Sequence, residues 1–246
     1  MRSEKKQLEF LLIHYFRECF NELPKGKIVA SESPDFILKM RKKFKLGIEL
    51  TRLSPLNLKT LTLKELERNR LRDEIINRAK NIFIQSSPIN LYVKFLFSDK
   101  VKIFPESSLV LSARLTNLVR NAVHDKNSNN FFRKSISCPS LPKGVEEILI
   151  IHDPILKSSV WERSNNLGVS EDIIEDISAT ILKKEEKLNL YQKQLLNGYW
   201  LIITTDRLRG TKNYNLQNKV LNHQFHSRFQ QVFLFDLMRA NILRLL

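Results

Sequence analysis

Two carboxylates, Asp35 and Glu49, stand in neighbouring apolar segments that are predicted to be strands, over residues 27–40 and 44–53. Alternate residues of a strand share a face, so a turn centred on Lys42 would place Asp35 directly opposite Glu49. Two like charges in that position destabilise a sheet unless one carboxylate is protonated or a cation lies between them. Because Mg²⁺ binds through one or two protein carboxylates and keeps several waters, we expect this pair to bind a divalent ion.

Basic residues outnumber acidic ones, with 41 Lys and Arg against 26 Asp and Glu and a formal net charge of +15. Such an excess attracts polyanions, and its spread over several segments suits a long nucleic acid better than a local membrane anchor. We therefore expect nucleic acid as the partner, DNA rather than RNA, and no membrane. The candidate phosphate-binding residues are Arg41, Lys42, Lys43, Lys45 and Lys183. The same cations offer another account of the two acids, an exposed hairpin in which residues 41–45 neutralise them.

The apolar runs of the chain are short, far below the roughly 18 to 20 residues that span a bilayer. The N-terminal segment interleaves charged and apolar residues, unlike a signal peptide, so we expect a cytoplasmic protein. Cys19 and Cys138 are far apart and form no CxxC pair, which argues against a disulfide framework and against a structural zinc site.

Helical and strand patterns alternate along the chain, which predicts an α/β fold with a mixed sheet. Helices are expected over 3–23, 62–83, 106–126 and 169–194, the last as one helix or a pair with Ser170 as a candidate N-cap. Thr62 and Glu65 have the spacing of a capping box. Besides the hairpin, strands are expected over 89–98, 146–154 and 198–206, and residues 125–143 are the most loop-like segment.

The segment "SPDF", a basic turn and then "GIELT" resemble the PD-(D/E)xK phosphodiesterase superfamily, which has the restriction-endonuclease-like fold. The resemblance implies a single α/β domain over residues 1–246, a mixed β-sheet flanked by helices. The core of this domain would cover about 1–54 and 171–246, and about 55–170 would be a largely helical insertion.

The same resemblance implies that Asp35 and Glu49 bind Mg²⁺ or Mn²⁺, with Glu32 as a further candidate ligand. The superfamily places a lysine two residues after the second acid, where this chain has Thr51. The catalytic lysine can migrate to a neighbouring element in the superfamily.

Two lysines of the segment 169–194 are candidates for the migrated catalytic residue, Lys184 first and Lys187 second. In one continuous helix, both would lie on the same side as Tyr191. A lysine near the attacking water would stabilise the charge that develops on the phosphate.

The function that the resemblance implies is metal-dependent hydrolysis of phosphodiester bonds in nucleic acid, by a nuclease that could act as a homodimer. Two alternatives of other classes stay open. One is a nucleic-acid-binding module that keeps the fold without turnover, which Thr51 favours. The other is a regulatory interaction protein whose inserted residues bind another protein.

Overall fold

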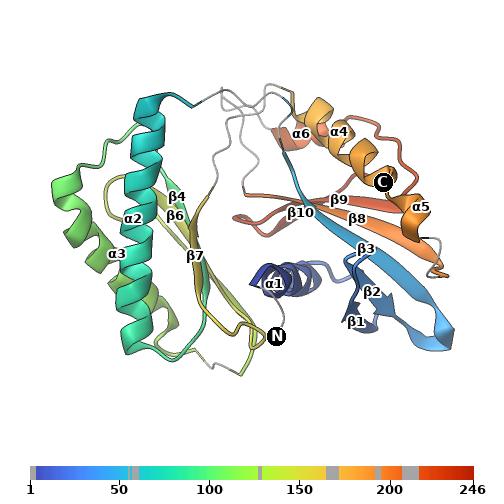
Figure 1. Ribbon diagram of the computed structural model, residues 1–246, viewed down its shortest axis with the longest axis horizontal. Helices are drawn as coiled ribbons and strands as arrows, with labels where there is room; N and C mark the ends of the chain where they lie inside the picture. The colour runs from blue at the N-terminus through green and yellow to red at the C-terminus, as the bar shows by residue number, and fades with distance from the viewer. Residues whose placement is uncertain are drawn as a thin grey trace. The chain divides into compact units, whose positions relative to one another are not determined.

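The computed structural model describes residues 4–54, 56, 61–126, 129–164, 172–191, 195–206 and 216–246. It is a mixed α/β structure with two sheets, each flanked by helices (Figure 1). The chain divides into two compact units. Unit 1 contains Met1–Leu11 and Thr60–Asn165, and unit 2 contains Leu12–Lys59 and Asn166–Leu246. The single domain over 1–246, with a core over about 1–54 and 171–246 and an insertion over about 55–170, stays a prediction; residues 4–11, expected in the core, fall in unit 1.

Unit 2 is built on a six-stranded mixed sheet. The strand order is β1, β2, β3, β8, β9, β10, and the bounds are Lys27–Ala30, Phe36–Lys39, Lys45–Arg52, Gly198–Thr205, Gln231–Asp236 and Asn241–Arg244. The pairs β1–β2, β2–β3 and β9–β10 are antiparallel, whereas β8 runs parallel to both β3 and β9. Strand β3 is therefore an interior strand, with a hydrogen-bonded neighbour on each side.

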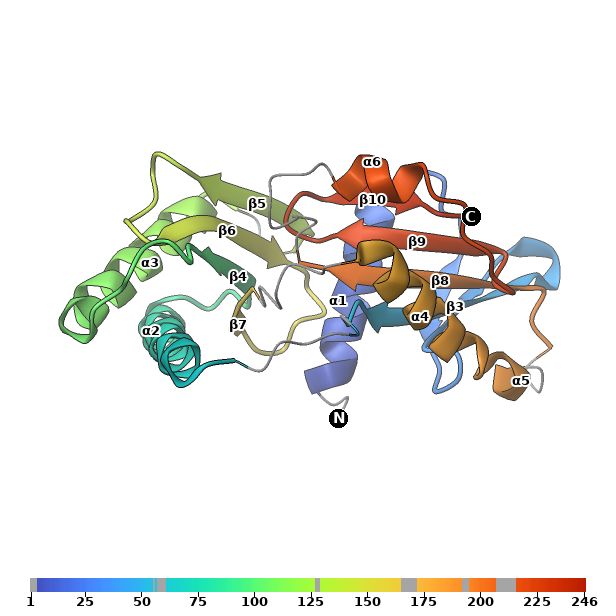
Figure 2. The same cartoon turned by 90° about the horizontal axis from the view of Figure 1, so that it is seen from above.

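Helices cover both faces of this sheet (Figures 1 and 2). Helix α1, Glu4–Cys19, lies on one face, where Phe16 packs edge-on against Phe233 of β9. On the other face lie α4, α5 and α6, with the bounds Ile173–Glu185, Leu188–Tyr191 and Leu216–Leu221. Ile177 and Ile181 of α4 are buried in one cluster with Leu201 of β8. A polar side chain between these layers destabilises the protein unless it is paired, because burial removes its water.

Two expectations for unit 2 need correction. The strand expected over 27–40 is two strands, and the break falls at Pro34, which has no N–H to donate to the ladder. The helix expected over 169–194 begins after Asp172, whose carboxylate accepts from the backbone N–H groups of Ile174 and Glu175. The expected cap, Ser170, lies outside the described residues.

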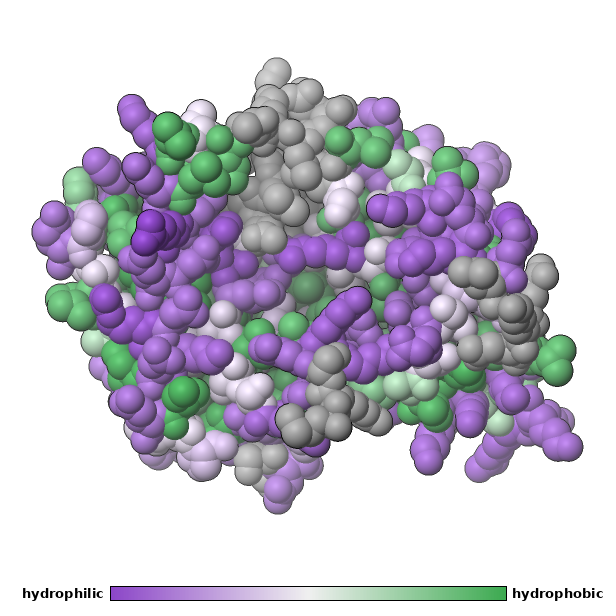
Figure 3. All heavy atoms as spheres, viewed as in Figure 1, coloured by the Kyte–Doolittle hydropathy of each residue, from purple (hydrophilic) through white to green (hydrophobic). Residues whose placement is uncertain are grey.

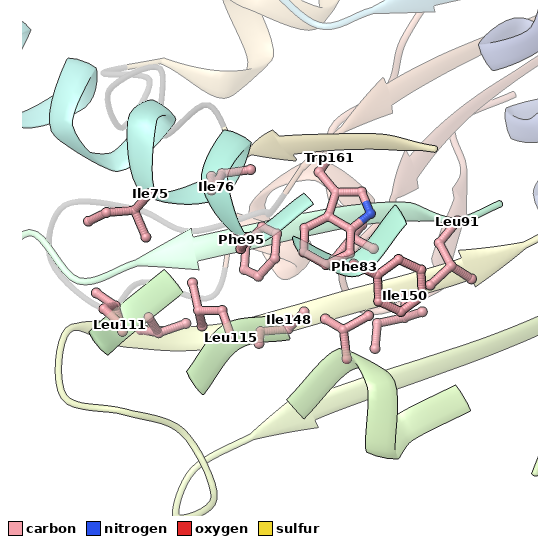
Figure 4. Packing of buried hydrophobic residues seen from close by; sticks show 14 of the residues in the cluster. Ile75, Ile76, Phe83, Leu91, Phe95, Leu111, Leu115, Ile148, Ile150 and Trp161 are labelled. Carbon is pink, nitrogen blue, oxygen red and sulfur yellow. The ribbon is translucent and has the colours of Figure 1, made fainter. Parts of the chain in front are cut away.

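Unit 1 contains a four-stranded sheet with the order β5, β6, β4, β7 and the bounds Phe132–Ser137, Val145–His152, Tyr92–Phe97 and Val160–Arg163. Helices α2, Leu63–Ser86, and α3, Ser108–Val123, cover one face of this sheet. Figure 4 shows the core between these helices and the sheet, in which the ring of Trp161 contacts those of Phe83 and Phe95. The capping box of Thr62 and Glu65 at the start of α2 is confirmed.

The expectation of a largely helical segment over 55–170 is confirmed only in part, because α2 and α3 lie beside a four-stranded sheet. Two strands of this sheet, β5 and β7, were not expected. Strand β5, "FRKSIS", lies in the segment expected to be a loop, and its side chains are mostly exposed or half-buried, so it lacks an apolar pattern. Strand β7 has only 4 residues, too few for a periodic signal.

The surface is largely polar in the view of Figure 3, with hydrophobic residues interspersed among hydrophilic ones. Within the ranges that the structure describes, no helix has both the length and the apolar character needed to cross a membrane.

Candidate active site

The hairpin of β2 and β3 has the register that the sequence predicts. Ile37 lies opposite Gly47, and the last pair of the ladder is Phe36 with Ile48. One further step along the same register places Asp35 opposite Glu49. The expectation of a turn centred on Lys42 is confirmed.

The turn of this hairpin uses an unusual backbone conformation for its residue types. Lys42 has φ 58° and Lys43 has φ 62°, both in the left-handed region that favours glycine and asparagine. The backbone N–H of Met40 donates to the carbonyl of Phe44 over 2.9 Å and closes the turn. The register is thus imposed by the pairing of the strands, because the turn residues do not favour it.

Asp35 is held against the adjacent strand by its carboxylate. Its Oδ2 accepts a hydrogen bond of 2.9 Å from the backbone N–H of Leu50. The preceding residue, Pro34, packs over Gly47, where a Cβ atom would lie 2.8 Å from the proline Cγ. A glycine at 47 is therefore needed for this close approach, which brings the half-buried Asp35 next to the strand that carries Glu49.

Glu49 is buried in the centre of unit 2 and forms an ion pair with Lys184. The side chain of Glu49 is 5% exposed and that of Lys184 is 16% exposed, and Nζ lies 2.7 Å from Oε1. Because β3 is an interior strand, Glu49 is shielded by β2, β8 and the helices above. The alternative of an exposed hairpin neutralised by residues 41–45 is wrong for Glu49, which pairs with a helix residue instead.

The position of Lys184 follows from the buried face of α4. Ile177 and Ile181 are buried on this helix, and Lys184 comes three residues after Ile181, so it lies on the same face. Lys187 lies beyond the end of α4, before α5 begins, and it is exposed. The structure therefore brings the first candidate lysine to the carboxylates and leaves the second at the surface.

Tyr191 completes the surroundings of Glu49, although the sequence analysis did not assign it a role. Its side chain is 1% exposed, and its ring packs against Tyr199 with 5.8 Å between the centroids. Burial first, and then the negative charges of Glu49 and Asp35, raise the pKa of the Tyr191 hydroxyl. Although the Glu49 carboxylate is near, no group of the described residues meets hydrogen-bond geometry with this hydroxyl oxygen. The only feature of the sequence that pointed to Tyr191 was its spacing of seven residues from Lys184, which places both residues on one side of a continuous helix.

The third candidate ligand, Glu32, is exposed. In the parts of the chain with described coordinates, no group of three His, Cys, Asp or Glu residues is placed to hold a metal ion. Glu32 therefore does not form a three-residue group with Asp35 and Glu49. Thr51 is half-buried, and its carbonyl accepts a hydrogen bond of 3.2 Å from the Thr204 hydroxyl.

Four of the candidate phosphate-binding residues lie in or next to the hairpin turn, apart from the carboxylates, whereas Lys183 is adjacent to Lys184 on α4. Arg41, Lys42, Lys43 and Lys183 are exposed, and Lys45 is half-buried. Glu49 is four residues along β3 from Lys45, or about 13 Å at roughly 3.3 Å per residue. The basic turn can therefore contact only a part of a ligand that extends well beyond the carboxylates.

The donor set fits a magnesium-type ion. Asp35 and Glu49 would supply two carboxylates, the number that Mg²⁺ commonly takes from protein, with water and substrate oxygens as the remaining ligands. The unpartnered hydroxyl of Tyr191 is consistent with a site that gains a further group when it is filled. Comparisons with family models, with curated proteins and with solved structures found no match to this chain.

Proposed function

We propose that this protein is a metal-dependent nuclease that hydrolyses phosphodiester bonds in nucleic acid, with DNA as the first substrate to test. The single observation that carries the proposal is the contact of 2.7 Å between Lys184 and Glu49. It brings a lysine to the acidic pair Asp35 and Glu49, which is the combination that the resemblance to the PD-(D/E)xK superfamily requires. The mixed sheet preceded by a helix in unit 2 supports the same assignment.

In this proposal Asp35 and Glu49 hold Mg²⁺ or Mn²⁺. The bound ion would supply an activated water and stabilise negative charge on the phosphate. The hydrogen bond from Leu50 N–H holds the Asp35 carboxylate in place, and the ion pair with Lys184 holds that of Glu49. Both carboxylates are thus oriented before substrate arrives.

Lys184 would act as a hydrogen-bond donor to the reacting groups. An ammonium group has three N–H donors and no acceptor, so it can keep its contact with Glu49 and still orient a water or a phosphate oxygen. Its positive charge would stabilise the transition state, in which negative charge develops on the phosphate.

The basic turn would set the length of substrate required. About 13 Å separates Lys45 from Glu49 along the strand, and a nucleic-acid strand rises about 3.4 Å per base step. The turn would therefore contact phosphates about four base steps from the bond that is cleaved.

A cleavage assay on plasmid DNA, single-stranded DNA and RNA, with Mg²⁺, Mn²⁺ or EDTA, tests the proposal. We expect cleavage only with a divalent ion, and a loss of at least about 100-fold in Asp35→Asn, Glu49→Gln and Lys184→Met. The matched control is Lys187→Met, which removes an exposed lysine three residues from Lys184. Wild-type rates in Glu49→Gln would contradict the active site assigned here, and no cleavage of any substrate with either metal would contradict a nuclease.

One observation favours a second candidate function, a nucleic-acid-binding module without turnover. Lys184 already neutralises Glu49, so this acid requires no metal ion for its stability, and Thr51 occupies the position where the superfamily has its lysine. This candidate predicts no cleavage, no measurable Mn²⁺ binding and nucleic-acid affinity that falls steeply with salt.

A further inference from the structure

The hydroxyl of Tyr191 is a polar group buried in an apolar cluster. Tyr191 is packed with Leu188, Leu201 and other apolar residues, and its side chain is 1% exposed. Within the described residues no group meets full hydrogen-bond geometry with its hydroxyl oxygen, although the Glu49 carboxylate is close to it. A buried hydroxyl without a partner destabilises a protein, and a phenylalanine would fill the same space without this cost.

The surroundings of this hydroxyl point to the acidic pair. Glu49 is paired with Leu201 in the register of β3 and β8, and Leu201 belongs to the same cluster as Tyr191. The negative charges of Glu49 and Asp35 both act on the phenol. The hydroxyl therefore lies close enough to the acidic pair for both carboxylates to act on it.

We propose that Tyr191 is a positioning residue for Glu49, whose hydroxyl donates a hydrogen bond to the Glu49 carboxylate when the site is filled by a divalent ion. This inference rests on the proposed function, because it assigns a role at the same site. Lys184 already contacts Oε1, and a second donor from α5 would hold the carboxylate plane in one orientation. Groups that orient a metal ligand in this way commonly change metal affinity by about 10- to 100-fold when they are removed.

The phenol is suited to this role because it stays protonated. A tyrosine hydroxyl has an ordinary pKa of about 10, so near neutral pH it is a neutral hydrogen-bond donor. A neutral donor orients Glu49 without reducing the negative charge that attracts the cation, whereas a second lysine at this position would compete with the metal ion.

Direct Mn²⁺ binding to the full chain, measured by isothermal titration calorimetry beside the thermal unfolding midpoint without metal, tests the inference. We expect Tyr191→Phe to weaken Mn²⁺ binding about 10-fold. The unfolding midpoint should stay the same or rise, because the variant removes an unpartnered buried hydroxyl. Cleavage should return to the wild-type rate at saturating Mn²⁺. The matched control is Tyr199→Phe, which removes a hydroxyl from the neighbouring ring and should leave Mn²⁺ binding unchanged.

The outcomes separate the inference from the function on which it rests. Equal Mn²⁺ affinity in Tyr191→Phe and wild type would overturn the role of Tyr191 and leave the metal site intact. A loss of affinity accompanied by a lower unfolding midpoint would also overturn it, in favour of a packing role. If the wild type binds no Mn²⁺, the proposed metal site itself is wrong, and the inference fails with it.

Discussion

The ammonium group of Lys184 lies 2.7 Å from the carboxylate of Glu49, although 135 residues separate them in the chain. The pair joins an interior strand to a covering helix, and both side chains are largely shielded from water. A buried ion pair of this kind is sensitive to the loss of one partner, because the remaining charge is left without compensation.

Lys184→Met should therefore destabilise the protein by about 3 kcal/mol, the lower end of the range for a broken buried pair, since Lys184 is partly exposed. The free energy of unfolding in urea measures the effect. The double variant Glu49→Gln/Lys184→Met should recover part of the loss, with an interaction energy of roughly 1–3 kcal/mol. Additive losses in the two single variants would show that the pair is not coupled. Lys187→Met should change stability by less than about 0.5 kcal/mol.

The turn of the hairpin offers a stabilising change. Lys42→Asn/Lys43→Gly places residues that accept the left-handed region at φ 58° and 62° and should raise the free energy of unfolding by about 1 kcal/mol. Arg41→Gly is the control, because Arg41 does not have positive φ, and it should destabilise the protein. Urea unfolding at neutral pH checks both variants, and a loss of stability in the double variant would contradict the turn geometry.

Gly47→Ala should disturb the candidate site through its neighbour. The new Cβ atom would lie 2.8 Å from Pro34 Cγ, so Pro34 must shift, and Asp35 with it. We expect a loss of about 1–3 kcal/mol in stability and weaker Mn²⁺ binding. Gly198→Ala, which meets the side-chain amide of Gln230, should leave Mn²⁺ binding unchanged. Equal Mn²⁺ binding in Gly47→Ala and wild type would show that the position of Pro34 does not affect metal binding by Asp35.

The start of α4 predicts a pH dependence of stability. The hydrogen bond from Lys219, and those from the N–H groups of Ile174 and Glu175, lower the pKa of Asp172 below its usual value of 3.8. A carboxylate with a lowered pKa contributes stability above its pKa in the unfolded chain, and this contribution is lost as the pH falls through the lowered value. Asp172→Ala should therefore cost about 1 kcal/mol at pH 7, with a difference from wild type that shrinks below pH 3.8. Urea unfolding at several pH values measures this difference, and a pH-independent cost would contradict it.

The basic turn predicts a change in the salt dependence of nucleic-acid binding. Lys42→Ala/Lys43→Ala should weaken binding to duplex DNA and reduce the slope of log K against log salt by about 2, since each phosphate contact contributes about 0.9. Fluorescence anisotropy over a salt series provides the slope. Lys100→Ala/Lys143→Ala removes two exposed lysines of unit 1 and serves as the charge-matched control. Equal slopes in the two double variants would indicate that only net charge matters.

Local patterns in the sequence determined the parts of the candidate site that depend on neighbours in the chain. The alternation of residues showed which side chains share a face, because a strand has a fixed side-chain period. The hairpin register followed only once a turn centred on Lys42 was assumed. The capping box of Thr62 and Glu65 was equally local. Strands β5 and β7 were missed because neither has an apolar pattern of sufficient length.

Only the tertiary structure decided what surrounds Glu49. The parallel pairing with β8 made β3 an interior strand, and this buried a carboxylate that the sequence alone also allowed at an exposed edge. The buried face and the end of α4 selected Lys184 over Lys187, although both lysines have helical spacing in the sequence. The separate short helix α5 carries Tyr191. These contacts join segments more than a hundred residues apart, and the local periods of helix and strand carry no information about such distant pairs.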